Sequence, residues 1–295
     1  MADSPEIPVL VPTLATTERR DYLLRALDSI LGQRGCRGLP VVIVNGDQSD
    51  AGVVAVLERM PVVRVLRLPA AHMGAALAAG RRALDAEVFA ELDDDDELLP
   101  DALATRLARL RATGGLDVVV SNSLLRGPAG ERESIPRIAA VEREPLVALM
   151  DRNWLIPGAA LFRTAAIPAD WFAAMPRYLE WTSLALRLCQ WRRLAFLPEP
   201  TVIHHEGHEF SVEASVAARL GSPAAFDELL AVDMPPAIRR RLHRKRTSAL
   251  HTAAEACRAG GNLGGAWRAH LASLVSVSGW RFLPYTRYLL KGRPR

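Results

Sequence analysis

The sequence lacks any apolar run that approaches the ~18 residues of a membrane-spanning helix. Its first residues, MADSPEIPVLVPT, carry acids and prolines where a secretory signal carries basic residues and then an apolar stretch. Only three cysteines are present, Cys36, Cys189 and Cys257, and they are far apart. Their odd number argues against a disulfide framework or a cysteine-based zinc site and favours reduced, buried thiols. We therefore expect a cytoplasmic protein.

Acidic residues are almost missing from the end of the chain. Residues 234–295 contain 13 Lys and Arg but one acid, Glu255, which gives a net charge of +12. Residues 1–233 hold the remaining 24 basic and 32 acidic residues, a net charge of −8. With 49% hydrophobic and 24% charged residues, the 295-residue chain is typical of a globular protein with one large core and an appended piece. We predict a catalytic domain over residues 1–220 and a basic helical extension over 221–295.

Short β-branched runs alternate with helical segments over the first 121 residues. The expected strands are residues 7–12, 40–44, 62–68, 87–92 and 116–121. The expected helices are residues 19–33, 53–59, 73–84 and 100–111. This alternation predicts a mostly parallel sheet with helices on both faces, and such sheets bind ligands at the carboxyl ends of their strands.

The alternation is less regular after residue 121. Expected there are a hairpin or loop (126–137), a helix (145–152), a strand (157–163), a helix (178–191) and two paired strands (194–197 and 201–205). Beyond Pro223 the pattern is helical throughout, and residues 260–265 have the composition of a joint between two helical hairpins.

Four consecutive aspartates stand in the stretch ELDDDDELLP, residues 91–100, among core-forming residues. Adjacent carboxylates repel one another and raise one another's pKa unless a cation lies between them. Asp93 and Asp95 form an Asp-x-Asp pair just past a strand end, which suits Mg²⁺ or Mn²⁺ and a diphosphate. The alternative interpretation is an acidic helix amino terminus, with Asp96 and Glu97 facing the helix dipole.

Three stretches in this order resemble an inverting family 2 glycosyltransferase with the GT-A fold: VLVPTLATTERRDYLLRALDSILGQRG (9–35), VVIVNGDQSD (41–50) and ELDDDDELLP (91–100). The resemblance covers roughly residues 7–211. It implies an α/β fold with a mostly parallel, Rossmann-like sheet, a nucleotide-diphosphate sugar donor and a Mn²⁺ or Mg²⁺ cofactor. The acceptor would be a hydroxyl on a small molecule, a glycan or a lipid-linked molecule.

The resemblance also implies roles for single residues, carried over by position. The donor-binding residues would be Pro12 and Thr13 near the nucleobase, Asn45 or Asp47 reading the base, Asp93 near the ribose or diphosphate, and Asp94 as a further donor contact. Asp95 would be a metal ligand. The chain departs from the family pattern at Asn45-Gly46-Asp47-Gln48-Ser49, where Asp-Asp-Gly-Ser or Asp-Asn-Gly-Ser is usual, and at Ala78-Ala79-Gly80, where Ala-Arg-Asn is usual. Arg81 or Arg82 would substitute for the missing arginine, or would be surface charges.

The catalytic base is expected in the later helix, where the resembling stretch is LEWTSLALR (179–187). Glu180 is the acid available to take the acceptor's proton, and its alternative role is a helix-start acid favoured by the dipole. His205, at the end of the last expected strand, would complete the metal site or touch the diphosphate, or would be a polar residue at a loop edge. Trp154 and Trp181 would stack on a sugar or lie in the core.

Two alternatives remain open from the sequence. The first is a non-catalytic descendant of the fold that binds a nucleotide or a partner surface, motivated by Asn45-Gly46 and Ala79-Gly80. The second concerns the basic and aromatic C-terminal helices, which would lie on the inner face of an anionic membrane or pack their aromatic face on the core. A homodimer is also expected. Nucleic acid is not an expected partner, because no groove-reading motif accompanies the basic charge.

Overall fold

The structure is a computed structural model that describes residues 4–69, 72–207 and 215–291 of the chain. The chain forms two compact units. The sheet unit comprises Met1–Met175 and Leu184–His208. The helical unit comprises Pro176–Ser183 and Glu209–Arg295.

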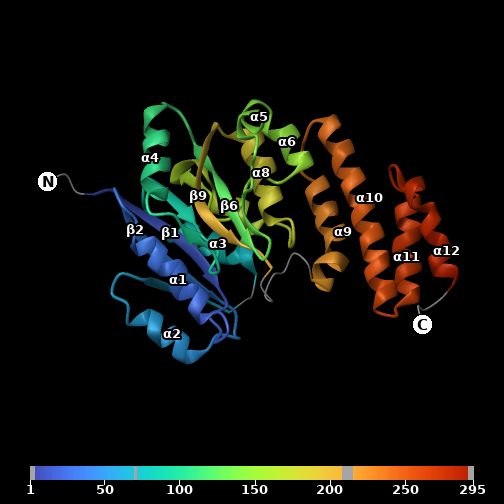
Figure 1. The fold of residues 1–295 in the computed structure, drawn as a ribbon, viewed down its shortest axis with the longest axis horizontal. Coiled ribbons are helices and arrows are strands. Elements are labelled where there is room, and N and C mark those ends of the chain that lie inside the picture. Colours follow the sequence, from blue (N-terminus) through green and yellow to red (C-terminus); the bar gives the residue numbers. More distant parts are fainter. Residues whose placement is uncertain (1–3, 70–71, 208–214, 292–295) are drawn as a thin grey trace. The chain divides into compact units, whose positions relative to one another are not determined.

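The described residues of the sheet unit form one nine-stranded sheet (Figure 1). Its strands are β1 (Glu6–Thr13), β2 (Arg37–Asn45), β3 (Arg64–Leu68), β4 (Val88–Glu91), β5 (Glu97–Leu98), β6 (Val118–Gly127), β7 (Gly130–Glu133), β8 (Ala160–Arg163) and β9 (Leu194–His205). Their order is β3-β2-β1-β4-β8-β6-β9-β5, and β7 pairs with β6.

The direction of the strands decides which residues meet at one edge. The strands β3, β2, β1 and β4 are parallel, β8 is antiparallel to both β4 and β6, and β6 is parallel to β9. The strands β6 and β9 therefore run in the same direction as β1. The carboxyl ends of β1, β2, β4 and β9 accordingly lie along one edge, which is the ligand-binding edge of such sheets.

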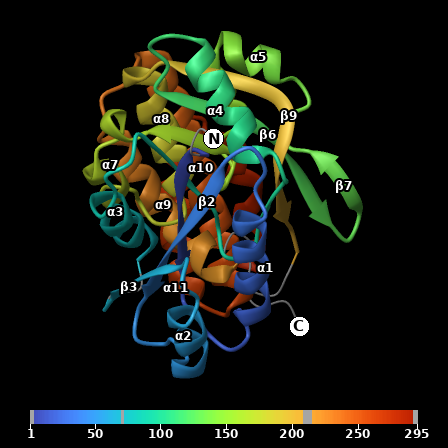
Figure 2. The same ribbon diagram turned by 90° about the vertical axis from the view of Figure 1, so that its left-hand side faces the viewer.

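Helices cover both faces of this sheet (Figure 2). They are α1 (Arg20–Leu31), α2 (Ala51–Glu58), α3 (Met73–Arg82), α4 (Ala102–Ala112), α5 (Ile138–Arg143), α6 (Pro145–Asp151), the 3₁₀ turn η1 (Thr164–Ala166), α7 (Ala169–Ala173) and α8 (Glu180–Trp191). Apolar residues of α1, α2 and α4 share one buried cluster with Val9 and Val11 of β1. Helix α3 lies on the other face, where a Cβ added to Gly80 would meet the Leu10 and Ile43 side chains at 2.8 and 3.0 Å.

The alternation of strands and helices confirms the predicted fold class. One expectation was wrong: residues 194–197 and 201–205 are not two paired strands but the single strand β9. It stays continuous across Pro198 and Pro200 because its pairing with β6 is irregular there, with register shifts around Asn122. A proline without an N–H is tolerated at such an irregularity.

The helical unit contains α9 (Val216–Leu230), α10 (Pro236–Ala259), α11 (Leu263–Leu274), the 3₁₀ segment η2 (Gly279–Tyr285) and α12 (Thr286–Leu290). Helix α10 packs between α9 and α11. The predicted joint lies between α10 and α11, where the Asn262 side chain accepts a hydrogen bond from the Gly265 N–H at 2.8 Å and caps α11. The predicted boundary at residue 220 falls inside α9, and the division into domains 1–220 and 221–295 stays a prediction. No helix in the described part of the chain is both long and apolar enough to cross a bilayer.

Candidate active site

The four aspartates form a tight turn between β4 and β5. The Leu92 N–H still pairs with the Leu10 carbonyl at 2.9 Å, and the Asp96 N–H then bonds the Asp93 carbonyl at 3.2 Å. Helix α4 begins only at Ala102 and has no acid in its first turn. Asp96 and Glu97 are therefore not the acidic start of a helix, and the charge run needs another explanation.

Asp94 points into the protein and ties the turn to the end of β1. Its carboxylate accepts a hydrogen bond from the Thr13 hydroxyl at 2.5 Å and is held by the guanidinium of Arg19. Burial raises the pKa of Asp94, while Arg19 and Thr13 oppose that shift. Burial also disfavours the charged Arg19, but Asp94 and Asp95 outweigh it and raise the Arg19 pKa. The Arg19–Asp94 ion pair thus joins the start of α1 to the aspartate turn, and the Thr13 hydrogen bond joins the turn to the end of β1.

Asp96 also points inward and ties the turn to the end of β9. Its carboxylate bonds the His204 ring at 2.8 Å and the backbone N–H of His205 at 3.0 Å. Burial raises the pKa of Asp96, against the effect of His204. Burial disfavours the charged ring of His204, yet the hydrogen bond and charge of Asp96 raise its pKa overall. Asp96 and His204 thus form a hydrogen-bonded acid–base pair beside the turn.

Three carboxylates of the turn can meet at one cation. Asp93, Asp95 and Asp96 each offer an oxygen, and these oxygens lie within 4.8 Å of one another. Burial raises the pKa of Asp93 well above its ordinary value, and repulsion from Glu91 and Asp95 adds to the effect. An all-oxygen donor set of this kind suits Mg²⁺ or Mn²⁺. The residues present therefore fit a divalent ion, which would relieve the repulsion.

His205 lies next to this group and contacts a different acid. Its ring bonds the Glu97 carboxylate at 2.7 Å, and Glu97 also pairs with Arg25 at 3.1 Å. The role of His205 as a metal ligand stays a prediction. A pocket of about 370 Å³ opens beside it, lined in part by Tyr22 and Arg25.

The ends of β1 and β2 carry the other expected donor-binding residues. Pro12 and Thr13 are buried at the end of β1, next to the aspartate turn. Asn45 is buried, and its side-chain oxygen accepts a hydrogen bond from the His72 N–H at 3.3 Å, at the start of α3. Asp47 follows in an exposed turn. The structure thus assigns Asn45 an internal contact and presents the Asp47 carboxylate to solvent.

Sequence reasoning missed a buried contact beneath the aspartate turn, in which Glu91 and Arg106 both bond the backbone of Gly158. The Glu91 carboxylate accepts a hydrogen bond from the Gly158 N–H at 3.1 Å, and the Arg106 guanidinium donates to the Gly158 carbonyl at 2.7 Å. Burial raises the pKa of Glu91 to about 8 and lowers that of Arg106 to about 9. Residue 158 is glycine because φ is +77° and a Cβ would approach Leu92 and Val202 to 2.8 Å. The available signal was a charged residue, Arg106, on the otherwise apolar face of its helix.

Arg19 was also missed, because only its contacts across 75 residues of sequence give it a role. The substitute arginines have structural partners instead. Arg81 donates to the carbonyls of Thr164 and Ile167, the latter at 2.8 Å, and Arg82 pairs with Asp170 at 2.7 Å.

Glu180 begins α8, in the segment of that helix that belongs to the helical unit. The preceding Tyr178 has a left-handed backbone (φ +73°), and a Cβ added to Gly221 of α9 would collide with its ring. A non-glycine residue in this conformation is strained, so packing must hold the start of α8 in place. The role of Glu180 as a base stays a prediction, as does the stacking role of the half-buried Trp181.

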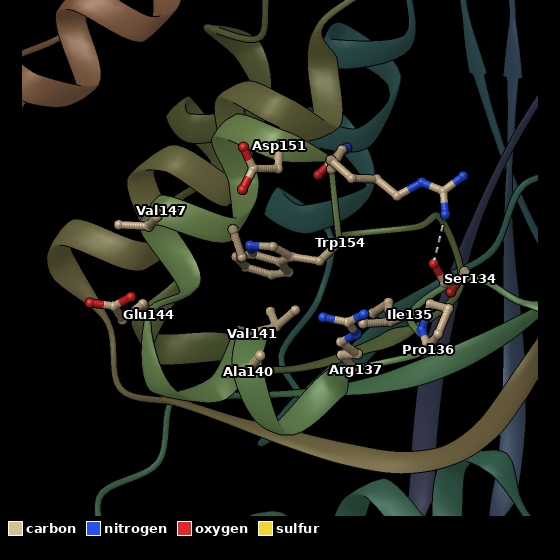
Figure 3. A pocket seen from close by; sticks show the side chains of 13 residues that line it. Ser134, Ile135, Pro136, Arg137, Ala140, Val141, Glu144, Val147, Asp151 and Trp154 are labelled. Carbon is tan, nitrogen blue, oxygen red and sulfur yellow. Dashed lines mark hydrogen bonds between the residues drawn. The ribbon is translucent and has the colours of Figure 1, made fainter.

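Trp154 lies in the core of the sheet unit. It is 2% exposed, its indole N–H donates to the Pro145 carbonyl at 2.8 Å, and its ring meets Phe196 edge-on at 5.0 Å. A pocket of about 430 Å³ lies beside it, and Figure 3 shows Trp154 among the side chains of α5, α6 and residues 134–137 that line this pocket. Arg152, which also lines it, donates to the Ser134 carbonyl at 3.2 Å. The core interpretation of Trp154 therefore accounts for its contacts.

Comparison with known proteins agrees with this architecture. A family model described as glycosyl transferase family 2 matches residues 9–166, more than half of the chain. The chain therefore belongs to glycosyl transferase family 2, which confirms the predicted family. It is accordingly a nucleotide-sugar-dependent glycosyltransferase. No curated protein matched the sequence.

Solved structures show the same fold at low sequence identity. The crystal structure of S. aureus TarS 1–349 in complex with UDP-GlcNAc is 15% identical, with a TM-score of 0.56 over 90% of this chain and 83% of that chain. The complex of S. aureus TarS 1–349 with UDP is 16% identical, with a TM-score of 0.53 over 91% and 88% of the two chains.

Proposed function

We propose that the chain transfers a sugar from a nucleotide-diphosphate donor to an acceptor hydroxyl, with a divalent ion at the aspartate turn and inversion at the anomeric carbon. The observation that supports the ion most directly is the group of Asp93, Asp95 and Asp96, whose oxygens lie within 4.8 Å of one another. A Mn²⁺ or Mg²⁺ ion bound there would supply positive charge to the departing diphosphate.

The protein's own residues would position the donor. Asp95 would hold the ion, and Asp93 would face the ribose or diphosphate from the same turn. Asp94, already bonded to Thr13 and Arg19, keeps the turn fixed to β1 beside the nucleobase site. A turn fixed by buried contacts needs little reorganisation during the reaction, which is how preorganised charge lowers a barrier.

The base-reading residue is proposed to be Asp47. Asn45 is buried and bonded to the start of α3, whereas Asp47 is exposed at the carboxyl edge of the sheet. A carboxylate accepts hydrogen bonds from ring N–H groups of a base. Because the TarS structures hold UDP-GlcNAc and UDP, a uridine diphosphate sugar is the first donor to test.

Glu180 is proposed to accept the proton of the acceptor hydroxyl. The acceptor oxygen then forms the new bond to the anomeric carbon as the bond to the diphosphate oxygen breaks, and the electron pair leaves with the nucleoside diphosphate. Attack on the face opposite the leaving group inverts the anomeric configuration. A positioned carboxylate base contributes typically 10²–10⁴-fold to such a step.

The function is tested by incubating the chain with UDP-sugars and simple hydroxyl acceptors, with Mn²⁺ or with a chelator. We expect transfer or slow donor hydrolysis that requires the ion, and NMR of the product should show the anomeric configuration opposite to that of the donor. Asp85→Asn is the matched control for Asp95→Asn, because Asp85 is an exposed carboxylate that precedes β4, whereas the aspartate turn follows this strand. Retained configuration would refute the inverting mechanism. Donor binding without any turnover would favour the non-catalytic alternative.

The remaining partners are also proposals. The acceptor hydroxyl is expected on a small molecule, a glycan or a lipid-linked molecule. A cytoplasmic location at the inner face of the membrane would suit the last of these. A homodimer is expected as well, and light scattering of the purified chain measures it.

A further inference from the structure

Large apolar side chains are exposed near the end of the helical unit. Val275 is 88% exposed, Trp280 78% and Leu290 74%. The C-terminal patch is defined here as the exposed residues Leu271, Val275, Val277, Trp280, Leu283, Tyr288 and Leu290. Single exposed apolar residues are ordinary, but several within twenty residues of chain indicate an interaction surface.

The exposure follows from how the segment folds. Helix α11 turns Ala266, His270 and Ser273 inward, so Leu271 and Val275, one turn apart, lie on its outer side. Gly279 then passes against the end of α11, where a Cβ would collide with the Ser273 carbonyl. Trp280, the next residue, is among the most exposed apolar residues of the described chain.

The segment that carries the patch is basic, and Glu255, just before it, is an acid close enough to act on its Tyr285. Residues 256–291 contain five basic residues and no acid: Arg258, Arg268, Arg281, Arg287 and Lys291. Among the ion pairs of the described residues, none joins Arg268, Arg281 or Arg287 to a carboxylate. The predicted packing of the aromatic face on the core therefore does not account for Trp280, and the basic rim is not neutralised by acids of its own segment.

Aromatic rings hold two of these arginines at the patch. The Arg281 guanidinium lies 4.7 Å from the centre of the Phe282 ring and bonds the Ser248 hydroxyl at 2.6 Å. The Arg287 guanidinium lies 4.7 Å from the centre of the Tyr288 ring. Both charges thus stay beside the apolar side chains, and the surface combines apolar anchors with fixed positive charge.

We propose that the C-terminal patch and its basic rim dock on the surface of an anionic lipid bilayer. A lipid surface supplies both an apolar layer for Trp280 and Leu283 and negative headgroups for the arginines. A second copy of the chain fits less well, because a two-fold interface places the patch on itself and sets basic residues against basic residues. The contact is interfacial, since no helix of the described residues can cross a bilayer.

Vesicle co-sedimentation of the full chain tests the proposal. We expect binding to vesicles of phosphatidylcholine with anionic phosphatidylglycerol, weak binding to phosphatidylcholine alone, and release as salt is raised. Trp280→Ser with Leu283→Ser should abolish binding. Arg281→Gln and Arg287→Gln should each weaken it about fivefold, the factor that corresponds to about 1 kcal/mol per basic residue near the surface.

Matched substitutions at exposed sites of the sheet unit provide the controls: Val62→Ser for the apolar change and Arg143→Gln for the charge change. Both should bind like the unsubstituted chain. Acyl chains carrying bromine should quench the fluorescence of the bound protein, and Trp280→Phe should remove most of that quenching while binding remains.

Three outcomes would overturn the proposal. The first is no binding to anionic vesicles at low salt. The second is binding that the patch and arginine variants leave unchanged. The third is a concentration-dependent dimer, seen by light scattering, that the Trp280→Ser, Leu283→Ser variant dissociates while vesicles bind neither form; this would assign the patch to a second copy. Because none of these readouts requires glycosyl transfer, failure of the proposed activity would not be mistaken for failure of the membrane contact.

Discussion

Asp95→Asn is expected to remove the response of the protein to Mn²⁺ while leaving the fold intact. Asp95 shares with Asp93 and Asp96 a group of oxygens within 4.8 Å of one another. At that separation and an effective dielectric of about 20, each pair of ionised carboxylates repels by about 3.5 kcal/mol. An asparagine amide at position 95 removes the repulsion with Asp93 and Asp96, but it also loses the ion pair with Arg19 at 2.9 Å. These changes oppose each other, so the free energy of unfolding without metal should change little.

The response to metal sets the scale of the measurement. A ligand that binds only the folded state at a hundred times its Kd raises the free energy of unfolding by about 2.7 kcal/mol. For a domain of this size, each kcal/mol shifts Tm by about 2–4 °C, so Mn²⁺ should raise Tm by roughly 5–10 °C. Asp95→Asn should lose this shift, and the control Asp85→Asn should keep it. An equal Mn²⁺-induced shift in Asp95→Asn would refute the assignment.

The same assay has a predicted pH dependence. The folded-state pKa values of Asp93 and Asp96 are raised above the unfolded value of 3.8, mainly by burial. Between the two values the folded state binds protons that the unfolded state does not, so the metal-free protein gains stability as pH falls from neutral. The same protons compete with a metal ion. The Mn²⁺-induced shift in Tm should therefore shrink as pH is lowered, and a shift that grew on acidification would contradict the carboxylate site.

Three further outcomes are expected. Glu180→Gln should keep the donor-induced shift in Tm and lose about 10²–10⁴-fold in turnover, and near-normal turnover would place the base elsewhere. Arg106→Leu should lower the free energy of unfolding in urea by about 1–3 kcal/mol, because the buried Gly158 carbonyl loses the guanidinium that donates to it, and unchanged stability would contradict a structural role for this contact. Burial and the nearby His251 lower the pKa of His270, so the unfolded state binds a proton first as pH falls below 6.5; in urea unfolding of the full chain this residue should make stability depend on pH, with a loss between pH 7.5 and 5.5 that opposes the gain from Asp93 and Asp96. His270→Gln should flatten that dependence.

The sheet and its ligand edge could be predicted because their signals are local. Runs such as 7–12 and 40–44 are β-branched and bounded by proline or polar turn residues, and the structure has β1 and β2 at these positions. Parallel strands then place Thr13, Asn45 and the aspartate run at one edge without any knowledge of their contacts. Periodicity and topology were enough for this part of the site.

The contacts within the site could not be predicted in the same way. Arg19 reaches Asp94 across 75 residues of sequence, and Arg106 reaches Gly158 across 52. Arg106 stands on an otherwise apolar helix face, which marks it as unusual but does not name its partner, and no local pattern marks Arg19 at all. The continuity of β9 was missed because Pro198 and Pro200 indicated a break in the strand. The prolines do mark an irregularity, but it is a register shift in the pairing with β6, and the strand continues through it.

The length of the aspartate run follows from the three strands that meet at it. A metal and a diphosphate account for Asp93 and Asp95, and in part for Asp96, but not for Asp94, and a helix dipole accounts for none of the four. Asp94 instead bonds the Thr13 hydroxyl at the end of β1, and Asp96 bonds His204 near the end of β9. Both carboxylates are buried, so each contact anchors one side of the turn. Loss of either anchor should therefore displace the oxygens of Asp93 and Asp95 without removing either of these two carboxylates.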